Sequence, residues 1–379
     1  MRTTRRLLAA TVAFTTAGTA LAAAPVGAVS DQARVPSLAF RGVATLPAGA
    51  AFDGTVVGGL SSITYDAARD VYYAISDARP ELGQGPWRFY TLKVDVSDGR
   101  LDPGDVTVTD VTPLTDAQGV AFPNGTVDPE GLALTGRDTL IVTSEGFSAP
   151  APPVAPFVRE FSLDGRQLRE FDLPAYTDPA PPSAGVRNNL GLESAALTPN
   201  GRFLFTGFEN ALAQDGPAAT LTTESRSRLL RYDARSGALQ REYVYVTDRV
   251  AEPPVPADAF TVNGLVELLP LNSQFLLAME RSFSVGAGNT VRLYRAALPG
   301  ATRVTGTADL DDAGTVRPVR KRLVLDLDDL GLTLDNIEGM TLGPRLPDGS
   351  RALLLVSDNN FTPGQVSQFL LFTARKIGR

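Results

Sequence analysis

The chain has 379 residues, carries a formal net charge of −7 and contains neither cysteine nor histidine. The two missing residue types exclude disulfide bonds, Ser-His-Asp and Cys-His nucleophilic sites, and zinc or iron sites built on histidine or cysteine. Any metal must be held by oxygen atoms, which favours calcium or magnesium. Acid–base chemistry falls to Asp, Glu, Lys, Tyr or a metal-bound water.

Residues 1–28 have the pattern of a secretory signal peptide. Arg2, Arg5 and Arg6 form a basic start, an alanine-rich apolar run extends from Leu7 to Ala24, and residues 26–28 offer a small-residue cleavage site. The alternatives are cleavage after Ala24, an uncleaved membrane anchor, or export through a twin-arginine signal. We expect a secreted, extracellular protein with one domain over residues 29–379.

The excess of acidic residues limits the kinds of partner that we expect for the protein. Of the 35 basic residues, three lie in residues 1–28, so 32 basic and 42 acidic residues remain after cleavage, a net charge of −10. Excess negative charge argues against nucleic acid and anionic membrane surfaces and fits cation binding. We expect a monomer that binds neither of these partners.

A fivefold repeat follows a first predicted strand, Ser37–Leu46. Each copy has a polar or acidic opening residue, a strand, a turn and a second strand that ends on an acid. The copies cover residues 59–77, 128–145, 188–210, 262–280 and 336–358. In the third copy, the Asn200-Gly201 hairpin turn separates Leu192–Leu197 from Phe203–Phe208. The 276 residues from Ser62 to Glu338 span four periods that average 69 residues, which suits four-stranded propeller blades.

Two further strands are predicted after each hairpin except the last. They are residues 88–94 and 106–111, 156–163 and 167–173, 227–232 and 239–246, 290–296 and 320–327, and a single strand at 368–373. Strand Ser37–Leu46 can complete the last blade and close the ring. We predict an all-β propeller with five recognisable four-stranded blades. A sixth blade between the fourth and fifth repeats, and a pair of β-sandwich domains, are the alternatives.

Hairpin geometry directs the acids of the repeats to one mouth of the channel, because the start of a blade's first strand and the end of its second lie at the same end. The opening residues are Ser62, Glu130, Glu193, Asn263 and Glu338. The closing residues, one strand further out, are Asp77, Glu145, Glu209, Glu280 and Asp358. The alternative is that these acids are the ordinary acidic residues found at the ends of β-strands and have no function of their own. Glu130, Glu193 and Glu338 are favoured as functional, because the small residue after each permits close backbone approach.

The eight carboxylates of this set are candidate metal ligands. Unpaired, they would repel and raise one another's pKa values. A hard cation relieves that repulsion, and calcium takes 6–8 oxygen ligands. Alternatively, arginines next to the motifs relieve the repulsion by pairing with some of these acids, or they bind an anionic substrate. The candidate substrate-binding residues are Arg79, Arg187, Asn189 and Arg281.

Three motifs resemble those of the phytase-like, or "esterase-like activity of phytase", family of secreted bacterial proteins. They are Asp128-Pro129-Glu130-Gly131-Leu132, residues 187–194 and residues 335–340, and the resemblance spans about residues 40–374. It implies hydrolysis of phosphate or carboxylic esters and kinship with calcium-dependent propeller phytases. Only Lys93 and Lys321 precede the lysine of the C-terminal tail, a thin basic lining for an anion as highly charged as phytate.

The leading hypothesis is a calcium-dependent hydrolase with Glu130, Glu193 and Glu338 as catalytic and metal-holding residues. Calcium would activate a water for attack on a small-molecule or anionic ester, and Arg187 and Arg281 would stabilise the developing negative charge. A non-catalytic extracellular ligand-binding propeller and a calcium-dependent lactonase-type enzyme are the alternative hypotheses.

Overall fold

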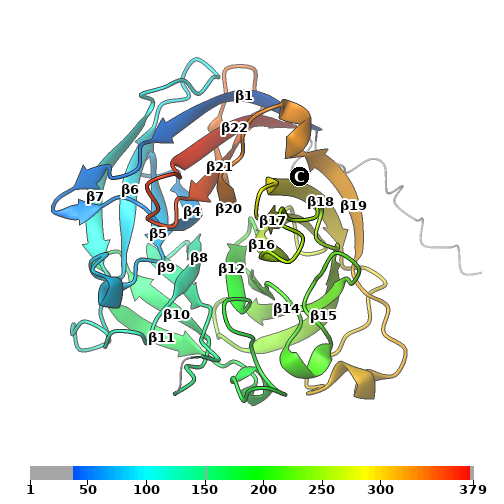
Figure 1. Ribbon diagram of the computed structural model, residues 1–379. Helices are drawn as coiled ribbons and strands as arrows, with labels where there is room; N and C mark the ends of the chain where they lie inside the picture. The colour runs from blue at the N-terminus through cyan, green and yellow to red at the C-terminus, as the bar shows by residue number, and fades with distance from the viewer. Residues whose placement is uncertain (1–36, 150–151, 376–379) are drawn as a thin grey trace, which may run out of the picture. The chain divides into compact units, whose positions relative to one another are not determined.

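A computed structural model describes residues 37–149 and 152–375, so the signal-peptide prediction for residues 1–28 lies outside the described residues. The described chain forms five four-stranded antiparallel sheets, arranged as the blades of a β-propeller (Figure 1). The innermost strands β4, β8, β12, β16 and β20 contact one another in that order around the ring, and β20 returns to β4. The predicted five-bladed propeller is confirmed.

The strands of the blades follow one another in chain order from the channel outward. Blade 1 has β4 (Leu60–Asp66), β5 (Val71–Ser76), β6 (Arg88–Val94) and β7 (Val106–Pro113). Blade 2 has β8 (Pro129–Leu134), β9 (Thr139–Ser144), β10 (Phe157–Ser162) and β11 (Gln167–Phe171). Blade 3 has β12 (Leu192–Leu197), β13 (Phe203–Phe208), β14 (Ser225–Asp233) and β15 (Leu239–Thr247). Blade 4 has β16 (Thr261–Pro270), β17 (Phe275–Ser284), β18 (Gly288–Ala297) and β19 (Arg320–Asp326).

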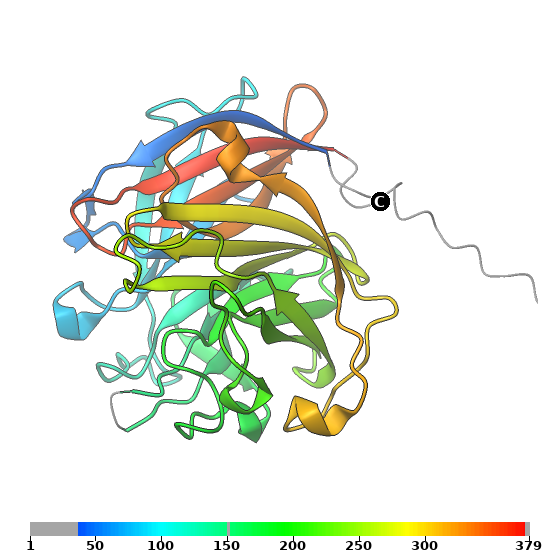
Figure 2. The same cartoon turned by 45° about the vertical axis from the view of Figure 1, so that its right-hand side comes forward.

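Blade 5 joins the two ends of the described chain. It contains β20 (Asn336–Arg345), β21 (Arg351–Asp358), β22 (Ser367–Arg375) and, outermost, β1 (Ser37–Leu46). β1 runs antiparallel to β22, with Ser37 opposite Arg375 and Leu46 opposite Ser367. The blue strand β1 lies along the red strand β22 in both views (Figures 1 and 2). The predicted closure by the N-terminal strand is confirmed.

The segments outside the blades are short. β2 (Ala51–Phe52) and β3 (Thr55–Val56) form a small hairpin, and there are 3₁₀ turns η2 (Pro80–Leu82), η3 (Ala175–Thr177), η4 (Ala213–Asp215), η5 (Leu310–Ala313) and η6 (Leu327–Leu330). Within the described residues, none of the helical turns has the length and apolar character needed to cross a membrane. The only strand between β18 and β20, an interval that the structure describes throughout, is β19, which belongs to blade 4, so the sixth-blade alternative was wrong.

Neighbouring blades pack face to face through apolar side chains. Between blades 3 and 4, Phe205, Leu229 and Tyr245 share one buried cluster with Leu265 and Leu276, all of them shielded from solvent. Both faces of these strands are covered, so a run such as Phe203–Phe208 is buried along its whole length instead of alternating between buried and exposed residues.

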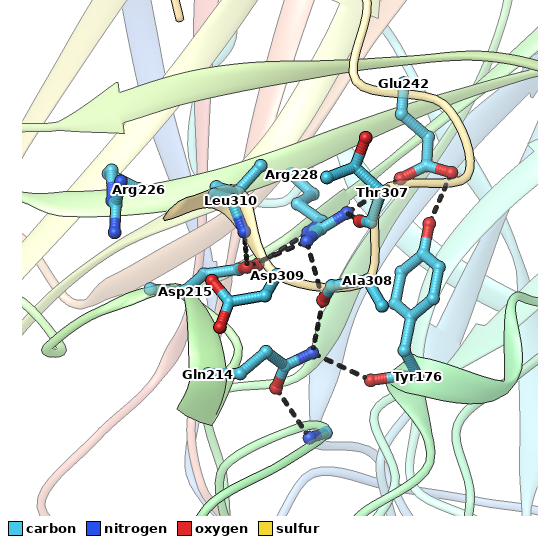
Figure 3. Close-up of polar contacts among 12 residues, drawn as sticks. Tyr176, Gln214, Asp215, Arg226, Arg228, Glu242, Thr307, Ala308, Asp309 and Leu310 are labelled. Atoms are coloured by element: carbon cyan, nitrogen blue, oxygen red, sulfur yellow. Dashed lines mark hydrogen bonds and ion pairs between the residues drawn. The ribbon is translucent and has the colours of Figure 1, made fainter. Parts of the chain in front are cut away.

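A buried ion-pair network joins loops of blades 3 and 4 (Figure 3). The guanidinium group of Arg228 on β14 is inaccessible to solvent and donates to Asp215 at 2.5 and 2.7 Å and to Glu242 at 3.1 Å. It also donates to two backbone carbonyls of residues 307–308, and Tyr176 donates to Glu242 at 2.5 Å. One cation therefore fixes η4, β15 and the long β18–β19 loop together.

Candidate metal centre

Each innermost strand carries a β-bulge. The extra residue is Ser61 in β4, Glu193 in β12, Val266 in β16 and Glu338 in β20, and in β8 the bulge includes Glu130. A bulged residue leaves the regular ladder, which re-aims its side chain. The three glutamates of this set line one pocket at the channel mouth.

The second ring of acids lies next to these bulges. The backbone N–H groups of Asp77, Glu145 and Glu209 each donate to the residue just before the innermost strand of their own blade. Asp358 ends β21, opposite Asn336. All four side chains line the same pocket as the bulged glutamates, so seven of the eight predicted carboxylates meet.

Two glycines allow the next blade to close over these acids. A Cβ at Gly191 would lie 2.2 Å from the carbonyl oxygen of Glu145, and a Cβ at Gly264 would lie 2.2 Å from Cγ of Glu209. The N–H of Gly191 also donates to Glu145 at 2.9 Å. Each acid is thus pressed between two blades, which is why both are only 2% exposed.

The placement of Glu280 at the mouth was wrong. In β17 the side chain that lines the pocket is that of Arg281, one residue later. Glu280 instead pairs with Lys321 at 2.5 Å and accepts from Tyr245 at 2.7 Å. Successive side chains of a strand point to opposite faces, so an error of one residue removes the carboxylate from the mouth.

Two of the predicted opening residues also lie elsewhere. Ser61, not Ser62, is the bulged residue of β4. Asn263 donates its side-chain amide to the carbonyl of Asp248 and to Glu280, away from the pocket lining. In both blades the position of the bulge determines which side chain faces the pocket. That position depends on how the innermost strand pairs with the neighbouring strand.

Arg79, Asn189 and Arg281, three of the four candidate substrate-binding residues, line the pocket. Arg79 forms an ion pair with Asp128 at 3.3 Å and donates to the side-chain oxygen of Asn189 at 3.4 Å. Arg281 donates to Glu338 at 2.8 Å. Both guanidinium groups are therefore held in place by acids and stand at the wall of the pocket.

Arg187 does not reach the mouth. Its guanidinium donates to the carbonyl oxygens of Ala211 at 3.1 Å and Gly216 at 2.7 Å, and the side chain is not among those that line the pocket. The prediction that Arg187 contacts substrate was wrong, because its side chain instead anchors the loop after β13 through these backbone contacts.

Two groups of three carboxylates are close enough to share a metal ion. In each group one oxygen per residue lies within 4.8 Å of the others; the groups are Asp77, Asp128 and Glu130, and Glu145, Glu193 and Glu209. We call them the first and second carboxylate triads. Asp128, which is fully buried, had no predicted role. The sequence feature that could have indicated a role for Asp128 is the Asp-Pro-Glu-Gly motif, of which it is the first residue.

The oxygens of the triads fit a hard cation. Three of them, Asp77 Oδ1, Asp128 Oδ1 and Glu209 Oε1, are buried without a hydrogen-bond partner in the described residues. An unsatisfied buried acceptor costs about 1–3 kcal/mol, and more when it is charged. Calcium or magnesium bound among carboxylate oxygens would remove that cost, and the donor set contains only oxygen.

The electrostatics agree with this donor set. Burial and then the neighbouring acids raise the pKa of Asp77 to about 7. Burial raises the pKa of Glu209 to about 7. The carboxyl pKa values of Glu130, Glu145 and Glu193 lie well above the ordinary value, from burial first and mutual repulsion second. Repulsion among these acids therefore adds to the effect of burial in raising their carboxyl pKa values.

The pocket itself has a volume of about 870 Å³ and a mixed lining. Besides the acids and arginines, it includes Phe260, Val262 and Phe283. The two phenylalanine rings lie 6.3 Å apart, and Phe260 is 64% exposed. The pocket thus offers a charged floor and an apolar surface to the same ligand.

Comparisons with known proteins identify the family. A model of the phytase-like family, described as esterase-like activity of phytase, matches residues 55–361. The chain belongs to the phytase-like family. An uncharacterized secreted protein of Arthroderma benhamiae is 25% identical over 200 residues, which cover 45% of this chain and 37% of that protein. This chain therefore spans well under half of that relative.

A solved structure also resembles the phytase-like chain. The tail fiber of Staphylococcus aureus phage P68 matches 89% of this chain and 52% of its own, with 12% sequence identity and a TM-score of 0.36.

Glu267 is a further buried acid of this phytase-like propeller, and it had no predicted role. It follows the bulge of β16 and accepts from Ser62 at 2.7 Å and from the N–H of Leu268 at 2.8 Å. Ser62 belongs to blade 1, so the bond joins blades 1 and 4 across the channel. Burial raises the pKa of Glu267 to about 8.

We expect Glu267→Gln to stabilise the protein more at pH 8 than at pH 5. In the unfolded chain the carboxyl ionises near 4.5, so between about pH 4.5 and 8 the folded protein holds a proton that the unfolded chain has lost. Stability therefore falls as pH rises through this window, and the amide removes this contribution. Urea unfolding at both pH values measures it. Glu170→Gln, at a half-exposed surface pair, is the control, and an equal effect of Glu267→Gln at both pH values would contradict the prediction.

Proposed function

We propose that this chain is a secreted, calcium-dependent hydrolase of phosphate or carboxylic esters that acts at the carboxylate mouth. The observation that carries the proposal is the pair of carboxylate triads, with buried oxygens that lack a hydrogen-bond partner in the described residues, beside an 870 Å³ pocket. Family membership supports hydrolysis, and the secreted relative supports export. The acidic charge supports a small ester, not nucleic acid or a membrane, as the partner of a monomer.

Glu130 and Glu193 belong to different triads and are the residues assigned to hold cations on the channel side. Bound calcium would supply a Lewis acid for the ester oxygen and a more acidic water. In each triad the second-ring acid, Asp77 or Glu209, carries a buried oxygen that has no hydrogen-bond partner in the described residues. These residues give up their protons when a cation binds.

Glu338 is the assigned proton acceptor. Its Oε1 accepts from Arg281 at 2.8 Å and from the side chain of Asn336 at 2.9 Å, which fixes the carboxyl group and leaves Oε2 for a water. Burial raises its pKa above the ordinary value, and a base works best when its pKa lies near the operating pH. Arg281 also offers positive charge where an oxyanion forms.

The lining favours an ester with one anionic or carbonyl group and an apolar part. Of the described residues, only Arg79 and Arg281 supply positive charge to the lining, and both form ion pairs with acids. Phe260 and Phe283 give an apolar surface. A polyanion such as phytate would find few free cations, whereas an aryl or alkyl ester would bury its apolar part.

The pairing of the acids favours an enzyme over a purely ligand-binding propeller. Among the described residues, the arginines of the mouth form ion pairs with Asp128, Glu209 and Glu338. Glu130, Glu145 and Glu193 have no such pair, which leaves them for a metal. A lactone is a cyclic carboxylic ester, so lactonase activity would use the same groups.

We expect hydrolysis of at least one ester class to disappear with EDTA and return with calcium. The panel is 4-nitrophenyl phosphate, 4-nitrophenyl butyrate and an aryl-substituted γ-lactone. Glu338→Gln should lower kcat by roughly 100-fold or more with little change in KM, the typical contribution of a general base. Glu170→Gln is the matched control. Calcium binding without turnover of any class would instead favour the ligand-binding propeller.

A further inference from the structure

A second pocket lies between blades 3 and 4, at the end of the ring away from the carboxylate mouth. Its lining includes the β12–β13 turn, the β16–β17 turn and the segment after β18, whereas Glu193 and Glu209 stand at the open end of the same hairpin. The volume is about 570 Å³. Among the described residues, four arginines and no carboxylate line it: Arg202, Arg231, Arg241 and Arg303.

Arg231 is the buried member of this group. It is 8% exposed, and its Nε is buried without a hydrogen-bond partner in the described residues. Its Nη2 donates to Gln240 at 3.2 Å, and its guanidinium group lies 4.3 Å from the centre of the Phe203 ring. An arginine that is nine-tenths buried ordinarily pairs with an acid, because burial of an unpaired charge is costly.

The other arginines add to the positive charge. Arg202 lies over the same Phe203 ring at 4.9 Å, so one ring positions two guanidinium groups. Arg241 donates to the hydroxyl of Tyr243 at 3.4 Å. Burial lowers the pKa of Arg231, and repulsion from these arginines and Arg303 adds to the decrease.

None of the four arginines forms an ion pair within the described part of the chain, in a protein with 42 acidic residues. By contrast, the buried Arg228 has two acid partners on the same blade. A cluster of cations that excludes acids matches a multiply charged anion. The planar guanidinium fork suits the geometry of phosphate.

We propose that this pocket binds a phosphate-bearing anion, either inorganic phosphate or the phosphate group of an ester, through Arg231 and its three neighbouring arginines. Four cationic groups favour a dianion over a simple carboxylate. Gln274 and the Tyr243 hydroxyl, which also line the pocket, are neutral groups available to the rest of a larger ligand. The site is separate from the carboxylate mouth and does not depend on the function proposed for it.

Calorimetric titration of the protein in EDTA, at constant ionic strength, tests the proposal with inorganic phosphate, glycerol 2-phosphate and acetate. We expect one phosphate site and at least tenfold weaker binding of acetate. Arg231→Gln should weaken phosphate binding by about tenfold or more, the usual effect of losing one charged hydrogen-bond donor. Tighter binding of glycerol 2-phosphate than of phosphate would identify an ester as the ligand, and equal binding would identify the free ion.

Arg303→Gln, at an exposed position of the pocket, keeps the test valid if Arg231→Gln does not fold, and it should weaken binding several-fold. Arg226→Gln, elsewhere on blade 3, and Glu338→Gln, at the carboxylate mouth, should leave it unchanged. No phosphate binding, or binding unchanged in Arg303→Gln, would overturn the proposal. Loss of binding in Glu338→Gln would overturn it as well, by moving the anion to the mouth.

Discussion

Glu193→Gln is expected to weaken calcium binding by at least about 100-fold. The substitution removes one of three carboxylates of the second triad and leaves a neutral amide of the same shape. Loss of one charge–charge contact near 4 Å is worth about 4 kcal/mol at an effective dielectric constant of 20, and relief of repulsion between the acids offsets part of it. Calorimetric titration of calcium into the metal-stripped protein measures the change.

The matched control is Asp311→Asn, in the exposed acidic run of residues 309–312. Its carboxylate is 76% exposed and pairs only with Arg226 at the surface. We expect the control to bind calcium as the unchanged protein does. Equal binding by the Glu193→Gln protein and the unchanged protein would remove the triads as the metal centre.

The same titration should depend on pH with a definite sign. Asp77 and Glu209 have pKa values of about 7, so near neutral pH each holds a proton for part of the time. Metal ligands must be deprotonated, so calcium affinity should rise as pH increases from 6 to 8, with release of protons. Titrations in two buffers of different ionisation enthalpy count those protons.

Arg228→Met is expected to lower the free energy of unfolding by about 3–5 kcal/mol, the usual cost of removing one partner from a buried ion pair. Asp215 and Glu242 would remain buried without their cation, and two carbonyls of the β18–β19 loop would lose a donor (Figure 3). Urea unfolding measures the difference. Arg226→Met, on the same strand and paired only at the surface, should cost about 0–1 kcal/mol.

A second variant separates lost charge balance from lost packing. Replacing Arg228, Asp215 and Glu242 together by Met, Leu and Leu removes the charges along with their desolvation cost, so most of the stability should return. A loss below about 1 kcal/mol in Arg228→Met alone would show that the network does not hold the loops.

Local pattern was sufficient for the strands and the ring. Phe203–Phe208 and the Asn200-Gly201 turn have the predicted bounds, because a hairpin is set by residues adjacent in the chain. Closure by β1 could be predicted because the last repeat has one strand fewer than a complete blade.

The same pattern failed where side-chain direction depended on a bulge. Glu280 and Arg281 are adjacent in the sequence, yet only Arg281 faces the mouth. The bulge at Val266 arises from pairing between two strands, and no local composition announces it. The prediction for Arg187 was wrong for a related reason, because its partners are backbone carbonyls of a loop that is distant in the sequence.

The sequence by itself limited the possible ligands of any metal to oxygen atoms, through the absence of histidine and cysteine, and it determined a fivefold strand pattern. Only the tertiary structure decided which acids meet and which remain unpaired. Asp128 and Glu267 were overlooked, and the four arginines of the second pocket come from residues 202 to 303. The physical reason is that burial and charge repulsion depend on distances across blades, which exist only after the ring has closed.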